Sequence, residues 1–122
     1  MKQRLEAVGV LLVVASIGLC ALFHASQHRL ILANCSGQTI RVITISVGGT
    51  SLTFNNVKSG ASVSGPFSIR GDDHFQVRGE LADQTKVDAD CGYVTNGMYG
   101  ERARFTIGAN GNVEFNQGRY GA

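Results

Sequence analysis

The stretch of sequence that decides the fold is residues 39–57, TIRVITISVGGTSLTFNNV. Its two halves are rich in β-branched and aromatic residues, which favour strands, and Gly48-Gly49 forms a tight turn between them. The first half has apolar side chains on both faces, so we expect a central strand or a bulge that switches its phase. The second half alternates through Leu52 and Phe54, as a strand with one buried face does.

On both sides of this stretch, similar segments alternate with clusters of Gly, Asn, Asp and Ser at short, even intervals. Pro66 cannot donate to a strand ladder, so its segment belongs at a sheet edge or is interrupted. Asn110-Gly111 predicts a type I′ turn, whose two central residues have positive φ. The pattern predicts an all-β fold: a single small Ig-like or transthyretin-like sandwich of seven or eight mostly antiparallel strands. The further expected strands are 29–35, 61–69, 74–81, 85–93, 102–108 and 113–115.

The composition agrees with one small domain. The chain has 122 residues with 16 glycines, one proline and no tryptophan, which suits a turn-rich β-protein. After residue 25, nine basic and eight acidic residues are scattered along the chain. A nucleic-acid binder needs a basic stripe, and none is visible in the sequence, so we expect no nucleic-acid partner.

The N-terminus predicts export. Residues 1–4 are basic, and residues 7–23, AVGVLLVVASIGLCALF, carry no charge. As a helix this run would be about 25 Å long, close to the hydrocarbon thickness of a bilayer. We expect an uncleaved signal anchor, a transmembrane helix within residues 1–25, with Lys2 and Arg4 kept in the cytoplasm by the positive-inside bias.

Other interpretations of this segment stay open. Cleavage after Ala25 would place Phe23 where a small residue is needed, which argues against removal but leaves a secreted or periplasmic form as the alternative. Cys20 lies in a sequence similar to a lipobox, with Leu19 in place of the required small residue. A buried core helix would need a groove that the β-rich remainder does not offer. The expected organisation is an anchor at 1–25, a linker at 26–28, the sandwich at 29–116 and a flexible tail at 117–122.

Four short motifs mark turns and core positions: Asn34-Cys35-Ser36-Gly37-Gln38, Gly60-Ala61-Ser62, Arg70-Gly71-Asp72 and Cys91-Gly92-Tyr93-Val94. With the N-terminal anchor, they make the chain similar to small signal-anchored periplasmic β-sandwich proteins of Gram-negative bacteria that carry no assigned activity. The resemblance implies a fold and a location, not a reaction. It implies a single-pass protein of the bacterial inner membrane, held through residues 7–23, with its C-terminal domain in the periplasm.

Two cysteines lie in the exported domain, Cys35 and Cys91. Alternation along the strands at 29–35 and 85–93 would point both into the core, and an oxidising compartment permits a bond between them. We expect a Cys35–Cys91 disulfide, which would stabilise the fold by about 4 kcal/mol in the chain-entropy model. Two buried free thiols are the alternative.

The densest polar cluster is Asp72-Asp73-His74, a weak metal candidate. A metal site needs three or four converging ligands, whereas adjacent strand residues alternate in direction, so turn chemistry explains this cluster better. Aspartates at 83, 88 and 90 suit calcium by ligand type but not by spacing, since they match no EF-hand loop. We therefore expect no cofactor.

No nucleophile, base and orienting group stand out together, so we expect no enzyme, with a hydrolase as the remaining catalytic alternative. The loop at 95–101 offers Met98 and Tyr99 as a contact for a partner, unless both tuck back onto the core. The sequence favours a membrane-tethered periplasmic sandwich acting as a protein-interaction or accessory structural module, with another envelope protein as partner. The alternative is a periplasmic small-ligand or ion-binding protein.

Overall fold

The computed structural model describes residues 28–95, 98 and 100–119, which form an all-β domain. The prediction of an all-β fold with seven or eight strands is confirmed, because these ranges contain eight strands and no helix. In chain order the strands are β1 (His28–Asn34), β2 (Ile40–Val47), β3 (Thr50–Val57), β4 (Ser62–Phe67), β5 (Asp73–Leu81), β6 (Lys86–Val94), β7 (Glu101–Ile107) and β8 (Val113–Arg119).

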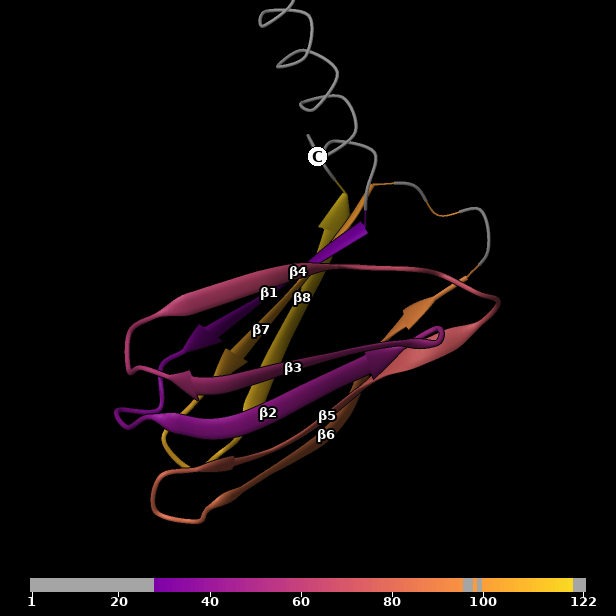
Figure 1. Cartoon of the computed structure of the whole chain (residues 1–122). Helices are drawn as coiled ribbons and strands as arrows, with labels where there is room; N and C mark the ends of the chain where they lie inside the picture. Colours follow the sequence, from indigo (N-terminus) through magenta and orange to yellow (C-terminus); the bar gives the residue numbers. More distant parts are fainter. Residues whose placement is uncertain (1–27, 96–97, 99, 120–122) are drawn as a thin grey trace, which may run out of the picture.

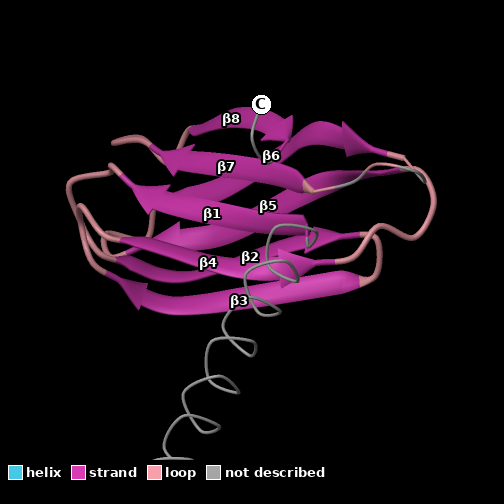
Figure 2. Cartoon of the chain, turned by 90° about the horizontal axis from the view of Figure 1, so that it is seen from above, coloured by secondary structure: helices cyan, strands magenta, loops and turns pink. Residues whose placement is uncertain are grey.

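These strands form two four-stranded sheets that pack face to face (Figures 1 and 2). Sheet A has the order β4-β1-β7-β8, and sheet B has the order β3-β2-β5-β6. β1 and β7 run parallel, while the other described pairs of neighbouring strands are antiparallel. The chain crosses between the sheets after β1, β3, β4 and β6, so strands that are consecutive in sequence are often in different layers.

Two irregularities expected from the sequence are present. β2 lies between β3 and β5, and its register with β5 shifts between Ile40 and Val42, so the strand is both central and bulged. The bulge lets Ile40 and Ile43 both be fully buried, although an odd spacing in a regular strand would put them on opposite faces. β4, which contains Pro66, is an edge strand of sheet A, where a missing N–H leaves no gap in a central ladder.

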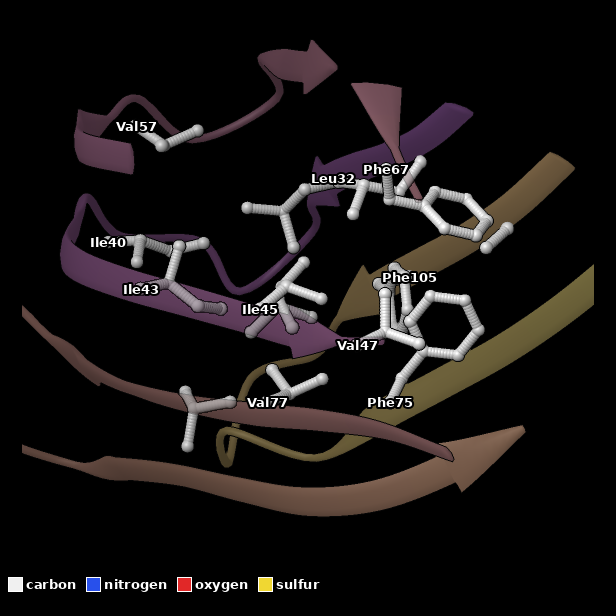
Figure 3. Packing of buried hydrophobic residues seen from close by; sticks show 14 of the residues in the cluster. Leu32, Ile40, Ile43, Ile45, Val47, Val57, Phe67, Phe75, Val77 and Phe105 are labelled. Atoms are coloured by element: carbon white, nitrogen blue, oxygen red, sulfur yellow. The ribbon is translucent and has the colours of Figure 1, made fainter. Parts of the chain in front are cut away.

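The core fills the space between the two inner faces (Figure 3). Phe75 stands at the centre of an aromatic cluster, with its ring centroid 5.3 Å from that of Phe67, 5.1 Å from Phe105 and 5.5 Å from Phe115. The first two contacts are edge-to-face, the arrangement that the ring quadrupole favours. Ile45 and Phe75 are fully buried, and burial of such side chains contributes about 1.5–3 kcal/mol each.

A buried asparagine joins the two layers at the end of β1. Asn34 is 1% exposed, and its Nδ2 donates to the carbonyl oxygens of Gln38 at 2.8 Å and Val57 at 2.9 Å. Its Oδ1 accepts from the Ser36 N–H at 3.0 Å and from the Ser36 hydroxyl at 2.6 Å. All four hydrogen-bonding positions of the amide are therefore used, and they tie β1 to the β1–β2 loop and to the end of β3.

The β7–β8 hairpin differs from the expected type I′ turn. Of its two expected central residues, Gly111 has positive φ, at 75°, and Asn110 does not. The Gly111 N–H donates to the Gly108 carbonyl at 3.0 Å, which makes Gly111 the fourth residue of the turn. This is the arrangement of a longer hairpin loop, in which a turn is followed by a glycine in the left-handed region. β8 continues to Arg119, because its backbone pairs with the start of β7, so residues 117–119 belong to the strand.

The expected Cys35–Cys91 disulfide is absent, and both thiols are free. Cys91 is half-buried against the core, as its strand phase predicts, but Cys35 is exposed. The predicted phase of the first strand was wrong, because Leu30 and Leu32 are the residues that point inward and are fully buried. Cys35 also follows the end of β1, where the chain turns away towards sheet B.

The expected anchor at 1–25, the linker residues 26 and 27, and the last residues of the expected tail, 120–122, lie outside the described residues. His28, the third residue of the expected linker, is the first residue of β1. Within the described ranges, no helix is long and apolar enough to cross a membrane.

Candidate functional site

The Asp72-Asp73-His74 cluster stabilises the fold locally. The Asp73 carboxylate accepts the Gly48 N–H at 2.8 Å through Oδ2 and the His74 N–H at 2.8 Å through Oδ1. These two donors hold the pKa of Asp73 below its usual value. The neighbouring Asp72 instead raises the pKa of the exposed Tyr93 hydroxyl. Among the described residues no group of three His, Cys, Asp or Glu side chains could hold a metal ion.

The aspartates of β6 are matched by a cation of β5. The Arg78 guanidinium contacts the carboxylates of Asp88 and Asp90, both at 2.9 Å. Asp83 accepts the Thr85 N–H at 2.9 Å and so closes the β5–β6 turn. Each of these acids has a structural partner, and they do not converge on a common point as calcium ligands do.

A groove of about 560 Å³ opens at the end of the sandwich where β1 begins. The His28 ring stacks on Phe67 with centroids 5.4 Å apart, and its Nδ1 accepts the Glu101 N–H at 3.1 Å. Burial lowers the pKa of His28, although the Glu101 carboxylate acts in the opposite direction. Because Nδ1 accepts a hydrogen bond, this contact belongs to the neutral ring with its proton on Nε2. The groove is lined by His28, Thr50, Pro66, Phe67, Ser68 and Ile69.

Next to this groove lies a buried acid that the sequence did not reveal. Glu101 is 3% exposed, and its Oε2 accepts from the Gln117 side chain at 3.2 Å. The same Gln117 amide donates to the Tyr93 carbonyl at 3.1 Å, so this network joins β6, β7 and β8. Within the described residues every buried side-chain polar atom has a hydrogen-bond partner. The Glu101 carboxylate is therefore buried together with a hydrogen-bond partner, as buried polar groups in proteins generally are.

Of the two residues expected to contact a partner, Met98 and Tyr99, the structure describes Met98. Met98 packs against the core as a half-buried residue, which agrees with the alternative that it tucks inward. Tyr99 lies outside the described residues.

The clearest unprotected feature is the free edge of β3. This eight-residue edge strand of sheet B contains no charged residue and no proline. Its outward side chains Ser51 and Thr53 are bonded to β2, through hydroxyl pairs with Ser46 and Thr44 at 2.9 Å. The other edge strands are protected by residues that oppose strand pairing: proline in β4, and charged side chains in β6 and β8.

The outer faces of the two sheets differ in charge. On sheet B, Arg78 is paired with two aspartates and Glu80 with Lys86 at 2.9 Å. On sheet A, the register of β1 with β7 brings Arg29, Arg102 and Arg104 onto one face. The sequence alone indicates that Arg102 and Arg104 share a face, because alternate positions of a strand do so. It does not indicate that β1, with Arg29, lies next to β7. Charged residues are thus scattered along the sequence, as expected, but three arginines gather on one face of the folded domain.

Comparisons with known proteins bear on the fold. The chain is similar to the NMR structure of a protein from Eubacterium rectale, with a TM-score of 0.56 and 17% sequence identity over 77% of this chain and 90% of that one. At this identity the likeness shows the fold alone. No protein-family model and no curated protein matches the chain.

Proposed function

We propose that the protein is a membrane-tethered interaction module of the bacterial cell envelope. In this proposal residues 7–23 anchor the chain in the inner membrane as a single pass, and the sandwich lies in the periplasm, where it binds another envelope protein. The proposal is supported by the uncharged apolar run at 7–23, which ends only four residues before β1 begins at His28. A domain connected in this way would remain close to the bilayer.

The observation that carries the interaction role is the free edge of β3. An edge strand presents unpaired N–H and C=O groups, and a partner strand can add to them by main-chain hydrogen bonds. β3 pairs with β2 from Thr50 to Val57 except at Asn56, whose φ is 54°, so residues 50–55 form the regular part of this edge. It lacks the charges and proline that normally prevent such pairing.

We further propose that the sandwich is transthyretin-like rather than Ig-like. An Ig constant-type domain keeps its first, second, fourth and fifth strands in one sheet. Here β1 pairs with β4 and β7, while β2 pairs with β3 and β5 in the other sheet. The strand order therefore favours the transthyretin-like type over the Ig-like type.

Site-specific photo-crosslinking tests the interaction role. A photoreactive phenylalanine analogue would replace the exposed Asn55 of β3 in the full chain, and its matched control would replace the exposed Asn116 of β8. After irradiation of intact cells, a covalent adduct of higher mass is expected from position 55 and not from position 116. Asn55→Lys, which places a charge on the edge, should reduce capture of that partner, whereas Asn116→Lys should not.

Equal adducts from both positions, or none from either, would contradict strand addition at β3. Membrane attachment is tested separately: extraction of the full chain from membranes by alkaline carbonate would contradict the tether. If N-terminal sequencing of the protein from the membrane fraction gives a sequence that begins near Ser26, the N-terminal segment is instead a cleaved signal.

The alternative of a periplasmic small-ligand carrier is favoured by one observation, the groove beside His28 and Phe67. Its volume of about 560 Å³ falls within the range of small-molecule sites. Native mass spectrometry of the protein extracted in mild detergent distinguishes this alternative, because a carrier would retain a bound small molecule and an interaction module would not.

A further inference from the structure

The outer face of sheet A carries an arrangement of like charges that the fold does not require. The parallel register sets Arg29 of β1 directly opposite Arg102 of β7, and Arg104 opposite Ile31. Neighbouring strands are about 4.8 Å apart, and residues two positions apart along a strand are separated by about 6.6 Å. Three arginines thus share a small area of the outer face that spans two central strands of the sheet, and the Arg102 guanidinium also donates to the Glu101 carbonyl at 3.1 Å.

Like charges directly opposite each other destabilise a sheet. The outer face of sheet B avoids this cost, since Arg78 lies between Asp88 and Asp90. On sheet A, Arg29 donates to the neutral Ser64 hydroxyl at 3.4 Å, and the exposed Arg104 lies opposite Asn116 of β8.

Outward positions of sheet A include one acid among the described residues. It is Glu114, which stands opposite Thr106 rather than opposite an arginine. These outward positions therefore carry a net positive charge, whereas Arg78 and Lys86 on the outer face of sheet B are each paired with an acid. A surface arranged in this way complements an extended anionic partner.

The chain itself indicates which anionic surface is nearest. Arg29 is only six residues beyond Phe23, the last residue of the apolar run, and six extended residues span at most about 20 Å. If residues 7–23 cross the bilayer, as the proposed function holds, Arg29 is within reach of the lipid headgroups. Guanidinium groups bind phosphate oxygens through paired N–H donors, which is the chemistry a phospholipid headgroup offers.

We propose that the outer face of sheet A binds the phosphate groups of anionic phospholipids, so that the sandwich lies with this face on the bilayer. The inference rests on the proposed tether and adds an orientation to it. In this orientation sheet B faces away from the membrane. The free edge of β3 is then accessible to a partner strand from the periplasm, so the two proposals are compatible.

The length of β1 determines how far Cys35 lies from the bilayer in each orientation of the sandwich. Its seven residues, from His28 to Asn34, extend about 23 Å away from the end at which the N-terminal segment enters. The exposed Cys35 follows directly. A sandwich standing on its end would hold Cys35 at least that far above the bilayer, whereas one lying on sheet A would hold it near the headgroups.

The experiment measures energy transfer from a dye on Cys35 to a headgroup-labelled acceptor lipid. The full chain, with Cys20→Ser and Cys91→Ala to leave one thiol, is reconstituted in vesicles of phosphatidylcholine alone or mixed with phosphatidylglycerol. We expect several-fold higher transfer in the anionic vesicles. We expect Arg29→Gln/Arg104→Gln to lower it to the value in neutral vesicles. The control Arg41→Gln/Lys58→Gln removes the same charge from sheet B and an exposed loop and should change little.

Each outcome decides between the proposals. Equal transfer in neutral and anionic vesicles, or an equal loss in the control variant, overturns the lipid-binding face while leaving the tether intact. A chain that fails to insert but binds anionic vesicles through Arg29 and Arg104 supports the face and refutes the tether. A chain that neither inserts nor binds overturns both. Arginine-dependent binding of soluble polyglutamate without any response to phosphatidylglycerol assigns the face to an acidic protein and overturns the lipid proposal.

Discussion

Replacing Asn34 by alanine should remove a large part of the stability of the sandwich. The substitution deletes four hydrogen bonds made by one buried amide. The Gln38 carbonyl keeps a partner, because the Ser36 hydroxyl lies 2.9 Å away and donates its one proton to this oxygen once Asn34 Oδ1 is removed. The Val57 carbonyl and the Ser36 N–H lose the side-chain partners that satisfy them in the interior.

The magnitude follows from these two orphaned groups. A buried polar group left without a partner costs roughly 1–3 kcal/mol, so the expected loss is about 4 kcal/mol. A domain of this size has a free energy of unfolding of roughly 5–14 kcal/mol, so the variant should be marginally folded. Such a loss lowers Tm by roughly 20 °C. Asn34→Asp keeps the shape but turns both donated bonds into contacts between a carboxylate and a carbonyl oxygen, so it should be at least as damaging.

The assay is thermal and urea unfolding of the full chain in a mild non-ionic detergent, followed by circular dichroism. Asn116→Ala is the control, because this exposed asparagine lies on an edge strand, and its loss should change stability by less than about 0.5 kcal/mol. A loss of less than about 1 kcal/mol for Asn34→Ala, the value expected for one ordinary hydrogen bond, would contradict this role of Asn34.

Three further predictions concern other parts of the domain. Gly79→Ala should lose roughly 1–3 kcal/mol by overpacking, because its Cβ would lie 2.6 Å from a carbonyl oxygen of β2, whereas Gly118→Ala, with nothing within 4 Å, should have little effect in the same unfolding assay. The pKa of Asp73 is lowered from 3.8, so its contribution to stability is present above that pH and is lost as pH falls through the lowered value. A plot of Tm against acidic pH should therefore be flatter for Asp73→Ala than for the native chain. In a Cys20→Ser background, maleimide should label Cys35 rapidly and Cys91 slowly, since Cys35 is exposed while burial raises the pKa of the Cys91 thiol. Mass spectrometry of peptides then reads the rates, and equal rates would contradict the exposures seen here.

Strand positions were predictable because turn chemistry is local. Gly48 and Gly49 both have positive φ, and the strands on either side begin and end where the sequence indicates. The edge position of β4 followed from Pro66, and the bulge in β2 from apolar residues on both faces. Each of these features is decided by a few neighbouring residues.

Strand order, and with it the candidate sites, could not be predicted in the same way. The pairing of β1 with β7 depends on which strands meet across the whole chain, and so does the arginine face that it creates. The phase of β1 failed for a related reason: Leu30 to Ala33 is apolar at every position, so both faces fit a buried assignment and only the packing of sheet B distinguishes them. The role of Asn34 depends on Val57, which lies 23 positions away.

The parallel pairing of β1 and β7 also affects how the protein is made. The first residue of β7 comes 73 positions after the first residue of β1, so a chain that emerges N-terminus first exposes β1 long before its central neighbour arrives. Until then β1 has only β4 to pair with, and its two inward leucines lack their neighbours Ala103 and Phe105 on β7. Sheet A therefore closes last, and contacts of such long sequence separation form slowly. A chain terminated before β7 would retain an apolar strand with one side open, which is the kind of fragment that aggregates.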